Sequence, residues 1–395
     1  MPAEGRPLLL AKAAALRYVP LPMKTEIFTI EPSMPDTAII DAAAIAVRQG
    51  ALVAFPTETV YGIACRALPE SIARLSRLKG AASDRPYTLH IAAKDDLKRY
   101  IERLGARSQK LIDTVWPGPL TVVFDISGYN LRRARQLFDG DVFRLLYGRD
   151  SIGIRCPDHP VAYELLRRAG VAVVAPSANP AGRPPPGDAA SVLSYFNGLV
   201  DIVLDAGPCR CKTSSTVVKV GKQKLEILRH GVLPADEVRK MWQVTVLFVC
   251  TGNTCRSAMA EGYFRHFMAQ KTGCGVDKLS ECGYKVISAG TVAEKGLSAA
   301  PEAVEACAGD GVDIHGHRSL RLSAELIEQS DVIFAMTGRH CRQIASIAPQ
   351  SNSRCRMLDP AADVLDPVGG GREVYSECAA MIRRAVKARV EEIEP

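Results

Sequence analysis

Short apolar runs alternate with helix-like spacing of apolar residues along most of the chain. Residues 51–55 read Ala-Leu-Val-Ala-Phe, an apolar run with the length of a buried strand. Within 71–79 apolar residues recur at every third position, which is typical of one face of a helix. Residues 171–174 and 215–218 contain paired valines and predict two further strands. This alternation predicts a mixed α/β fold from about residue 30 onward.

A second alternating region begins at a strongly apolar run, residues 244–249. A loop follows, and the spacing then predicts a helix over 259–268, a helix at 300–308, a strand at 331–335 and a helix at 373–390. Strands that alternate with helices in this way form parallel sheets with helices on both faces. The second half is therefore predicted to be a doubly wound, flavodoxin-like parallel sheet.

The chain is expected to divide near residue 240. Its 395 residues are enough for two or three domains. A polar stretch at 234–237 separates the last strand of the first region from the apolar run that opens the second. We expect four parts, namely an N-terminal extension (1–29), a first domain (30–235), a linker (236–243) and a second domain (244–395).

The composition is that of a globular protein. Hydrophobic residues make up 47% and charged residues 24%, which excludes wholesale disorder and collagen-like or coiled-coil architectures. The net charge of +7 is spread thinly, so it permits a polyanionic partner without requiring one, and anionic substrates explain it equally well. The twelve cysteines are scattered, which favours free thiols in a reducing cytoplasm. Since no apolar run approaches the roughly 18 residues of a membrane span, we expect a cytoplasmic protein without a membrane partner.

One loop of the second half combines a cysteine with an arginine. Cys250 and Arg256 are separated by five residues, in a loop that leaves an apolar strand and enters a helix. Loop N–H groups and the helix N-terminus converge in such a turn and attract anions. The positive field is expected to lower the thiol pKa of Cys250 from about 8.5 toward the range of about 3.5 to 7.5, giving a thiolate nucleophile. Arg256 can hold two phosphate oxygens in its planar fork. The loop predicts attack on phosphorus, and a buried core thiol is the alternative.

A phosphoryl transfer of this kind also needs an acid for the leaving group. The second half has two Asp-Pro pairs, at Asp359 and Asp366, and three glycines follow the second pair at 369–371. A glycine-rich loop is suited to reach a substrate held by another loop. We therefore predict Asp366 as the general acid, with a plain turn-forming role as the alternative.

Four ordered motifs of the second half point to one family. They are residues 249–257 (Val-Cys-Thr-Gly-Asn-Thr-Cys-Arg-Ser), 288–290 (Ser-Ala-Gly), 335–337 (Ala-Met-Thr) and 363–367 (Asp-Val-Leu-Asp-Pro). Through them residues 244–395 resemble the low-molecular-weight protein tyrosine phosphatases. The resemblance implies a phosphocysteine intermediate on Cys250, phosphate binding by Arg256, Asp366 as acid, and no cofactor. It assigns support of the phosphate loop to Thr251, Gly252, Asn253, Thr254, Cys255 and Ser257, with Asn253 and Ser257 as braces.

Two loop positions bear on the substrate. Tyrosine-directed members of that family usually carry an aliphatic residue where Thr254 stands, whereas the protein-arginine phosphatases, a bacterial branch that this half resembles more closely, carry threonine there. We therefore expect a phosphoarginine or phosphotyrosine protein substrate. Cys255 is near enough to Cys250 to protect it as a disulfide after oxidation. Arsenate reductases share the fold and are an alternative if Cys307 or Cys341 supplies a further redox thiol.

The first half carries no Gly-x4-Gly-Lys-Ser/Thr loop, so a nucleotide would have to be held in another way. Polar residues stand at two predicted strand ends, 57–61 and 177–179, and Lys79 closes the helix between them. Hydroxyls, an amide and a lysine at strand ends suit a ligand with a carboxylate and a phosphate. On spacing alone, ordinary turns explain the same residues.

Five ordered motifs narrow the choice, at 56–62, 116–121, 153–157, 177–179 and 228–231. Through them residues 30–235 resemble the Sua5/YciO/YrdC family of threonylcarbamoyl-AMP synthases. The resemblance implies a twisted open α/β sheet with a basic concave face. It also implies that L-threonine, bicarbonate and ATP are condensed into threonylcarbamoyl-AMP for the t6A modification of tRNA. The partners would then be tRNA or the tRNA threonylcarbamoyl-transferase machinery, and Mg²⁺ would accompany ATP.

The same resemblance assigns ligand contacts residue by residue. Nucleotide contacts fall on Lys79, Arg155, Ser177, Asn179, Ser215 and Arg229, and threonine contacts fall on Thr57, Tyr61 and His90. The family expects Lys-x-Arg, whereas this chain has Ala81 in the place of the arginine and Arg85 four residues further on. Residues 209–212 (Cys-Arg-Cys-Lys) also replace a usually glycine-rich approach to Ser215. We predict a bifunctional enzyme; the alternative is a phosphatase fused to a non-catalytic RNA- or nucleotide-binding module.

Overall fold

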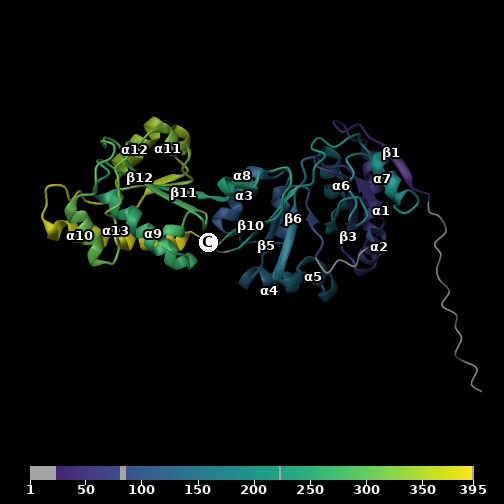
Figure 1. Ribbon diagram of the computed structural model, residues 1–395, viewed down its shortest axis with the longest axis horizontal. Helices are drawn as coiled ribbons and strands as arrows, with labels where there is room; N and C mark the ends of the chain where they lie inside the picture. The colour runs from purple at the N-terminus through teal and green to yellow at the C-terminus, as the bar shows by residue number, and fades with distance from the viewer. Residues whose placement is uncertain (1–23, 81–85, 222–223, 394–395) are drawn as a thin grey trace, which may run out of the picture.

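The computed structural model describes residues 24–80, 86–221 and 224–393, and places two α/β halves side by side along its long axis (Figure 1). A ten-stranded sheet forms the first half and a four-stranded sheet forms the second. The predicted fold class is confirmed for both halves. The expectations for Ala81 and Arg85 lie outside the described residues.

The sheet of the first half is open and mixes parallel with antiparallel pairs. Its spatial order is β1-β8-β2-β3-β7-β4-β6-β5-β9-β10. The strands are β1 (Glu26–Thr29), β2 (Val53–Phe55), β3 (Gly62–Arg66), β4 (Leu89–His90), β5 (Leu120–Asp125), β6 (Ser151–Arg155), β7 (Val173–Val174), β8 (Ile202–Asp205), β9 (Thr216–Val220) and β10 (Leu225–Arg229). Strands β2, β4 and β7 are very short and buried throughout, so the middle of the sheet lies between two apolar layers.

The register of the central strands brings several predicted contacts together. His90 on β4 lies opposite Arg155 on β6, and Thr121 on β5 lies opposite the same arginine. Strand β9, which follows Ser215, pairs in parallel with β5. Residues from four parts of the sequence therefore meet in one row across the sheet.

The helices of the first half begin and end where local chemistry predicts. The Asp36 carboxylate accepts hydrogen bonds from the N–H groups of Ala38 and Ile39 at the start of α1. Helix α2 opens on Pro69 and ends at Gly80, which has φ +70°. These helices are α1 (Thr37–Arg48), α2 (Pro69–Lys79), α3 (Ala106–Val115), α4 (Gly128–Leu137), α5 (Gly140–Leu146), α6 (Pro160–Ala169), α7 (Ala189–Phe196) and α8 (Ala235–Trp242), with 3-10 turns at Lys94–Arg99 and Gly148–Asp150.

The second half is a doubly wound parallel sheet. Its strands β11 (Val244–Cys250), β12 (Tyr284–Gly290), β13 (Val332–Ala335) and β14 (Cys355–Met357) pair in parallel in the order β12-β11-β13-β14. Every residue of β11 is buried, because apolar clusters cover both faces of this central strand. The helices are α9 (Arg256–Thr272), α10 (Pro301–Gly309), α11 (Ala324–Glu328), α12 (Gly338–Ile347) and α13 (Arg372–Glu392), with 3-10 turns at Val276–Lys278 and Pro349–Ser351.

The two halves meet through α3 and α8 (Figure 1). Arg107 of α3 is buried, and its guanidinium lies 4.6 Å from the ring centre of Trp242 and 4.8 Å from that of Tyr284. It also donates to the carbonyl of Cys282. Lys110 of α3 pairs with Asp331 at 2.7 Å. The first half is thus anchored at the end where β11 and β12 begin.

The structure departs from the expected division of the chain in two places. Most of the expected linker, 236–243, is helix α8, which packs on α3 and places Trp242 in the core of the first half. Strand β1 pairs with β8 from Glu26 onward, inside the stretch expected as an N-terminal extension. Within the described residues, no helix is long and apolar enough to cross a membrane.

Two candidate active sites

Cys250 is the last residue of β11, and the loop that follows folds back over its thiol. The side chain is almost completely buried, at 2% exposure. Its Sγ lies 2.9 Å from Ser257 Oγ and accepts the N–H of Asn253 at 3.2 Å. Helix α9 begins at Arg256, so its N-terminus faces the same point. The strand, loop and helix predicted for a phosphate site are all present.

Burial changes the expected ionisation of this thiol. Burial raises the pKa of Cys250, against the direction predicted from the sequence. The hydrogen bonds from Ser257 and from the N–H of Asn253, followed by the charge of Arg256, act in the opposite sense and lower the pKa. The lowered pKa was predicted from the loop N–H groups and the helix N-terminus alone, and the loss of water around the sulfur cannot be seen in the sequence. The thiolate therefore depends on the loop donors to offset desolvation.

Arg256 and Asp366 come together beside the thiol. Arg256 Nη2 lies 2.5 Å from Asp366 Oδ2, and its Nη1 donates to the carbonyl of Val364 at 3.2 Å. The arginine side chain is 6% exposed and the aspartate 47%, so the pair extends from the buried loop to the surface. Asp359 instead accepts the N–H of Ala361 at 2.9 Å. Of the two Asp-Pro pairs, the second is the one that reaches the loop.

Asn253 makes hydrogen bonds on several sides of the loop. It has φ +57°, a left-handed conformation that an asparagine tolerates better than most residues. Its Nδ2 donates to Ser257 Oγ at 2.9 Å and to Ser288 Oγ at 2.8 Å, and its Oδ1 accepts the N–H of Leu320 at 2.7 Å. The backbone carbonyl of Asn253 contacts His317 Nε2 at 2.6 Å. Four partners thus fix one strained residue.

Sequence reasoning missed several residues behind and beside the loop. Ser288 donates to Glu261 Oε2 at 2.7 Å, and burial raises the pKa of this carboxyl. His340 on α12 lies 3.0 Å from Thr251 Oγ1, and burial lowers its pKa to about 4. The Ser-Ala-Gly and Ala-Met-Thr motifs marked these regions of the sequence. Their spacing gave no sign of Glu261 or His340.

The remaining cysteines have different surroundings. Cys255 Sγ lies 3.3 Å from the hydroxyl of Tyr375 and 3.6 Å from Thr254 Oγ1, in the phosphate loop itself. Cys307 is buried in the core beside Tyr263, and Cys341 lies on α12 beside Cys355. The loop thiol Cys255 is therefore the one placed at the wall of the site.

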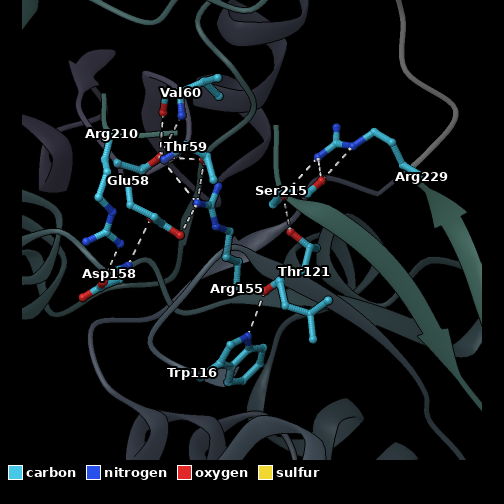
Figure 2. Close-up of polar contacts among 12 residues, drawn as sticks. Glu58, Thr59, Val60, Trp116, Thr121, Arg155, Asp158, Arg210, Ser215 and Arg229 are labelled. Carbon is cyan, nitrogen blue, oxygen red and sulfur yellow. Dashed lines mark hydrogen bonds and ion pairs between the residues drawn. The ribbon is translucent and has the colours of Figure 1, made fainter. Parts of the chain in front are cut away.

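In the first half, a buried arginine organises the expected threonine loop. Arg155 Nη2 donates to Glu58 Oε1 at 2.9 Å, to Thr59 Oγ1 at 2.7 Å and to Thr57 Oγ1 at 3.4 Å (Figure 2). The side chains of Arg155 and Glu58 are only 6% and 1% exposed, so each charge is stabilised by the other in place of water. The predictions from the sequence named Arg155 and Thr57 but not Glu58, which stands between two threonines and has no apolar flank to mark it as buried.

Lys79 and Asn179 form a second part of this site. Lys79 Nζ donates to the carbonyls of Ser177 at 2.7 Å and Asn179 at 2.5 Å, and burial lowers its pKa to about 8. The Asn179 amide donates to the carbonyls of Pro180 and Arg183. Its Oδ1 is buried, with no hydrogen-bond partner among the described residues. A buried acceptor of this kind is a position where a ligand can donate.

Ser215 and Arg229 form the third part. Ser215 Oγ lies 2.9 Å from Thr121 Oγ1, and Arg229 Nη2 donates to the same hydroxyl at 3.0 Å (Figure 2). Burial lowers the pKa of Arg229, and the neighbouring charge of Arg155 acts in the same direction. The two cations face the same region of the sheet, which favours an anionic ligand between them.

Tyr61 and His90 complete the predicted set. The Tyr61 hydroxyl donates to the carbonyl of Gly207 at 2.8 Å and accepts the N–H of Ala206 at 3.2 Å. Burial, and then the charge of Arg155, lower the pKa of His90 to about 3, so its imidazole is neutral. The residues predicted from four motifs therefore line one region of the first sheet.

Comparison with known proteins bears on both halves. Residues 45–231 match the Sua5/YciO/YrdC family, described as telomere recombination. Residues 245–394 match the low molecular weight phosphotyrosine protein phosphatases. The two matched segments join at α8 and the start of β11.

Individual relatives agree with this division. Threonylcarbamoyl-AMP synthase of Pyrococcus abyssi is 33% identical over 231 residues, which cover 58% of this chain and 65% of the relative. Its counterpart in Halorhodospira halophila is 37% identical over 163 residues, covering 41% and 80%. The crystal structure of a YwlE mutant from Bacillus subtilis is 31% identical and covers 38% of this chain and 98% of that one, with a TM-score of 0.34.

Fold and sites together define a two-domain α/β protein, with neighbouring cations on the sheet of one half and a loop that joins a buried cysteine to an arginine in the other. The chain belongs to the threonylcarbamoyl-AMP synthase family through its first half, and a low molecular weight phosphatase domain is fused to it. It spans 65% and 58% of the length of the curated relatives from P. abyssi and B. subtilis.

Proposed function

We propose that the chain is a bifunctional enzyme. The first half forms threonylcarbamoyl-AMP for the t6A modification of tRNA, and the second half dephosphorylates a protein through a phosphocysteine. One observation carries the proposal: each half gathers in a buried setting the groups that its reaction needs. The first half has three cations, Lys79, Arg155 and Arg229, and a buried open acceptor, Asn179 Oδ1. The second half has the Cys250 thiol in one loop with Arg256, which pairs with Asp366.

In the proposed synthesis, the threonine amine and bicarbonate form a carbamate with loss of water. A carbamate oxygen then attacks the α-phosphorus of ATP, the bond to the bridging oxygen breaks, and pyrophosphate leaves. Lys79, Arg155 and Arg229 supply positive charge for the triphosphate and for the charge that develops on it. Thr57, Tyr61 and His90 are the proposed threonine contacts.

Mg²⁺ is expected to enter this site on the ATP phosphates. Magnesium commonly keeps several waters and is held by substrate phosphates with one or two carboxylates. Among the described residues, no group of three or more His, Cys, Asp or Glu side chains could hold a metal ion. The protein's own part in the proposal is therefore to supply cations and hydroxyls around the nucleotide.

In the proposed dephosphorylation, the Cys250 thiolate attacks phosphorus while Arg256 holds two of the equatorial oxygens. The bond to the leaving group breaks, and Asp366 gives the leaving atom its proton. Water then attacks the phosphocysteine, Asp366 takes a proton from it, and the Cys250 thiolate leaves. Arg256 and Asp366 are paired before a substrate binds. Binding of the substrate in the second half therefore requires its phosphate to replace Asp366 as the partner of Arg256.

Phosphoarginine is the proposed preferred substrate. Thr254 presents a hydroxyl at the wall of the loop, 3.6 Å from Cys255 Sγ, and the Tyr375 hydroxyl lies 3.3 Å from the same sulfur. A hydroxyl favours a polar guanidinium over an aryl ring, because a buried polar group loses its hydrogen bond when an apolar ligand faces it. A second candidate, arsenate reduction, would use Cys255 as the resolving thiol.

The synthase is tested by pyrophosphate release from ATP that depends on both L-threonine and bicarbonate. If the full chain binds ATP but releases no pyrophosphate, the first half is instead a nucleotide- or RNA-binding module. The phosphatase is tested with Cys250→Ser, which we expect to abolish turnover of phosphoarginine and phosphotyrosine peptides while leaving pyrophosphate release intact. Retention of most phosphatase turnover by this variant would disprove Cys250 as the nucleophile.

A further inference from the structure

Residues 206–212, here called the strap, lie against Tyr61, one of the predicted threonine contacts, and against the loop that carries it. The strap accepts a hydrogen bond from the Tyr61 hydroxyl at Gly207, and the N–H of Ala206 donates back to that hydroxyl. Further along, the N–H of Cys211 donates to the backbone carbonyl of Glu58 at 2.8 Å. The strap is thus bonded to both ends of the Glu58 to Tyr61 loop. Its position decides how that loop faces a ligand.

One ion pair joins the strap to the buried charges beneath it. Arg210 Nη2 lies 2.8 Å from Asp158 Oδ2, and the N–H of Asp158 donates to Glu58 Oε2 at 3.1 Å. The other oxygen of Glu58 holds Arg155, which reaches the threonine hydroxyls of the loop. Figure 2 shows these side chains as one continuous chain of polar contacts. Arg210 is its solvent-facing end.

The strap is held under backbone strain. Lys212 has φ +51°, a left-handed conformation that is unfavourable for a residue with a Cβ. Such strain persists only where surrounding contacts fix the backbone. Lys212 is exposed, so its own burial does not supply those contacts. The strap is held by the hydrogen bonds of Gly207 and Cys211, by the N–H of buried Cys209, which donates to the carbonyl of Gly187 at 2.7 Å, and by the Arg210 ion pair.

We propose that Arg210 is a positioning residue of the synthase half. By pairing with Asp158 it holds the strap against the Glu58 to Tyr61 loop, and so tunes affinity for the amino-acid substrate rather than the chemical step. The inference rests on the proposed synthase function. It concerns the four-residue segment Cys-Arg-Cys-Lys that this chain has before Ser215.

The size of the expected effect follows from the exposure of the pair. The side chains of Arg210 and Asp158 are 68% and 47% exposed, and an ion pair at such exposure changes an equilibrium constant by up to about fivefold. We therefore expect Arg210→Ala to raise the KM and Kd for L-threonine about three- to fivefold. The KM for ATP and kcat should change less than the KM for L-threonine, because Lys79 and Arg229 do not touch the strap ion pair and Arg155 is linked to it only through Asp158 and Glu58.

The experiment measures L-threonine binding calorimetrically and pyrophosphate release kinetically on the full chain. Arg168→Ala is the matched control, because Arg168 also forms a long-range ion pair, with Asp41 at 2.6 Å, on another part of the first half. Arg210→Lys should retain most of the threonine affinity. Arg210→Asp combined with Asp158→Arg should recover it, since the pair is then restored with its charges exchanged.

Each outcome decides the proposal. A selective loss of threonine affinity that the exchanged pair restores supports it. An unchanged threonine Kd in Arg210→Ala, in a chain that still makes product, overturns the inference and leaves the proposed function standing. A loss of kcat, both KM values and thermal stability together means a merely structural role, which also overturns it. If the parent chain neither binds threonine nor releases pyrophosphate, the proposed synthase function fails and the inference fails with it.

Discussion

Replacing Ser257 by alanine tests how the phosphate loop offsets burial of its thiol. The Ser257 hydroxyl lies 2.9 Å from Cys250 Sγ and accepts Asn253 Nδ2 at 2.9 Å. Since the asparagine amide donates to this oxygen, the hydroxyl proton is free to point at the sulfur. It is thus a donor aimed at the thiolate from the first turn of α9.

The magnitude can be worked from this geometry. A hydrogen bond to a charged group contributes about 1.5 to 3 kcal/mol, and one pKa unit corresponds to about 1.4 kcal/mol. The hydroxyl lowers the pKa of Cys250, so Ser257→Ala should raise that pKa by about one to two units. At neutral pH the thiolate fraction, and with it kcat/KM for phosphopeptides, should fall about ten- to a hundredfold.

The assay is the pH dependence of Cys250 alkylation by iodoacetamide, followed by mass spectrometry of the peptide that contains it. The profile of Ser257→Ala should move to higher pH, whereas Ser257→Thr, which keeps a hydroxyl, should stay near the parent. Ser323→Ala is a control, because Ser323 caps α11 in the same half. Superimposable profiles for Ser257→Ala and the parent chain would refute the reasoning, provided that inorganic phosphate still protects both.

Four further predictions follow from the structure. Asp366→Asn should lower turnover most for substrates with poor leaving groups and flatten one limb of the kcat pH profile; the same effect from Asp359→Asn would show that the wrong Asp-Pro pair was chosen. Thr254→Ile should shift the turnover ratio from phosphoarginine toward phosphotyrosine, and an unchanged ratio would contradict the proposed preference. Burial lowers the pKa of His340 from 6.5 to about 4. Its contribution to the free energy of unfolding is therefore fully present above pH 6.5 and is lost as the pH falls toward 4, because the imidazole is protonated first in the unfolded chain. His340→Asn should therefore reduce the loss of urea stability across that range. Arg107→Ala should cost about 2 to 3 kcal/mol of unfolding free energy in guanidinium titrations, since it removes buried cation–π and hydrogen-bond contacts.

The fold was largely predictable from local patterns. Residues 244–249 are apolar throughout because β11 is buried on both faces, and the loop and helix after it follow from the Cys250 to Arg256 spacing. The region 236–243 was misread because its polar start resembles a linker. Helix α8 is amphipathic over only two turns, and the packing of Trp242 on the first half is not visible in such a short stretch.

The sites were predictable where one motif contains the chemistry, and not where partners are distant in sequence. Cys250 and Arg256 share one loop, so their spacing was sufficient. Glu58 and Arg155 are 97 residues apart, and only the packing of the sheet makes them a buried ion pair. The pKa of Cys250 was misjudged for the same reason, since burial depends on every element around the loop.

His340 shows how a neutral imidazole can orient the phosphate loop. Its Nε2 lies 3.0 Å from Thr251 Oγ1 and its Nδ1 lies 2.8 Å from Thr337 Oγ1. Thr251 Oγ1 already accepts Arg256 Nη2 at 3.3 Å, so its own proton is directed to Nε2, and Nδ1 then carries the ring hydrogen that Thr337 accepts. A charged imidazole would carry hydrogens on both nitrogens, so Nε2 could no longer accept the proton of the Thr251 hydroxyl. Burial, which keeps His340 neutral, therefore preserves this hydrogen bond beside the arginine that the proposed reaction requires.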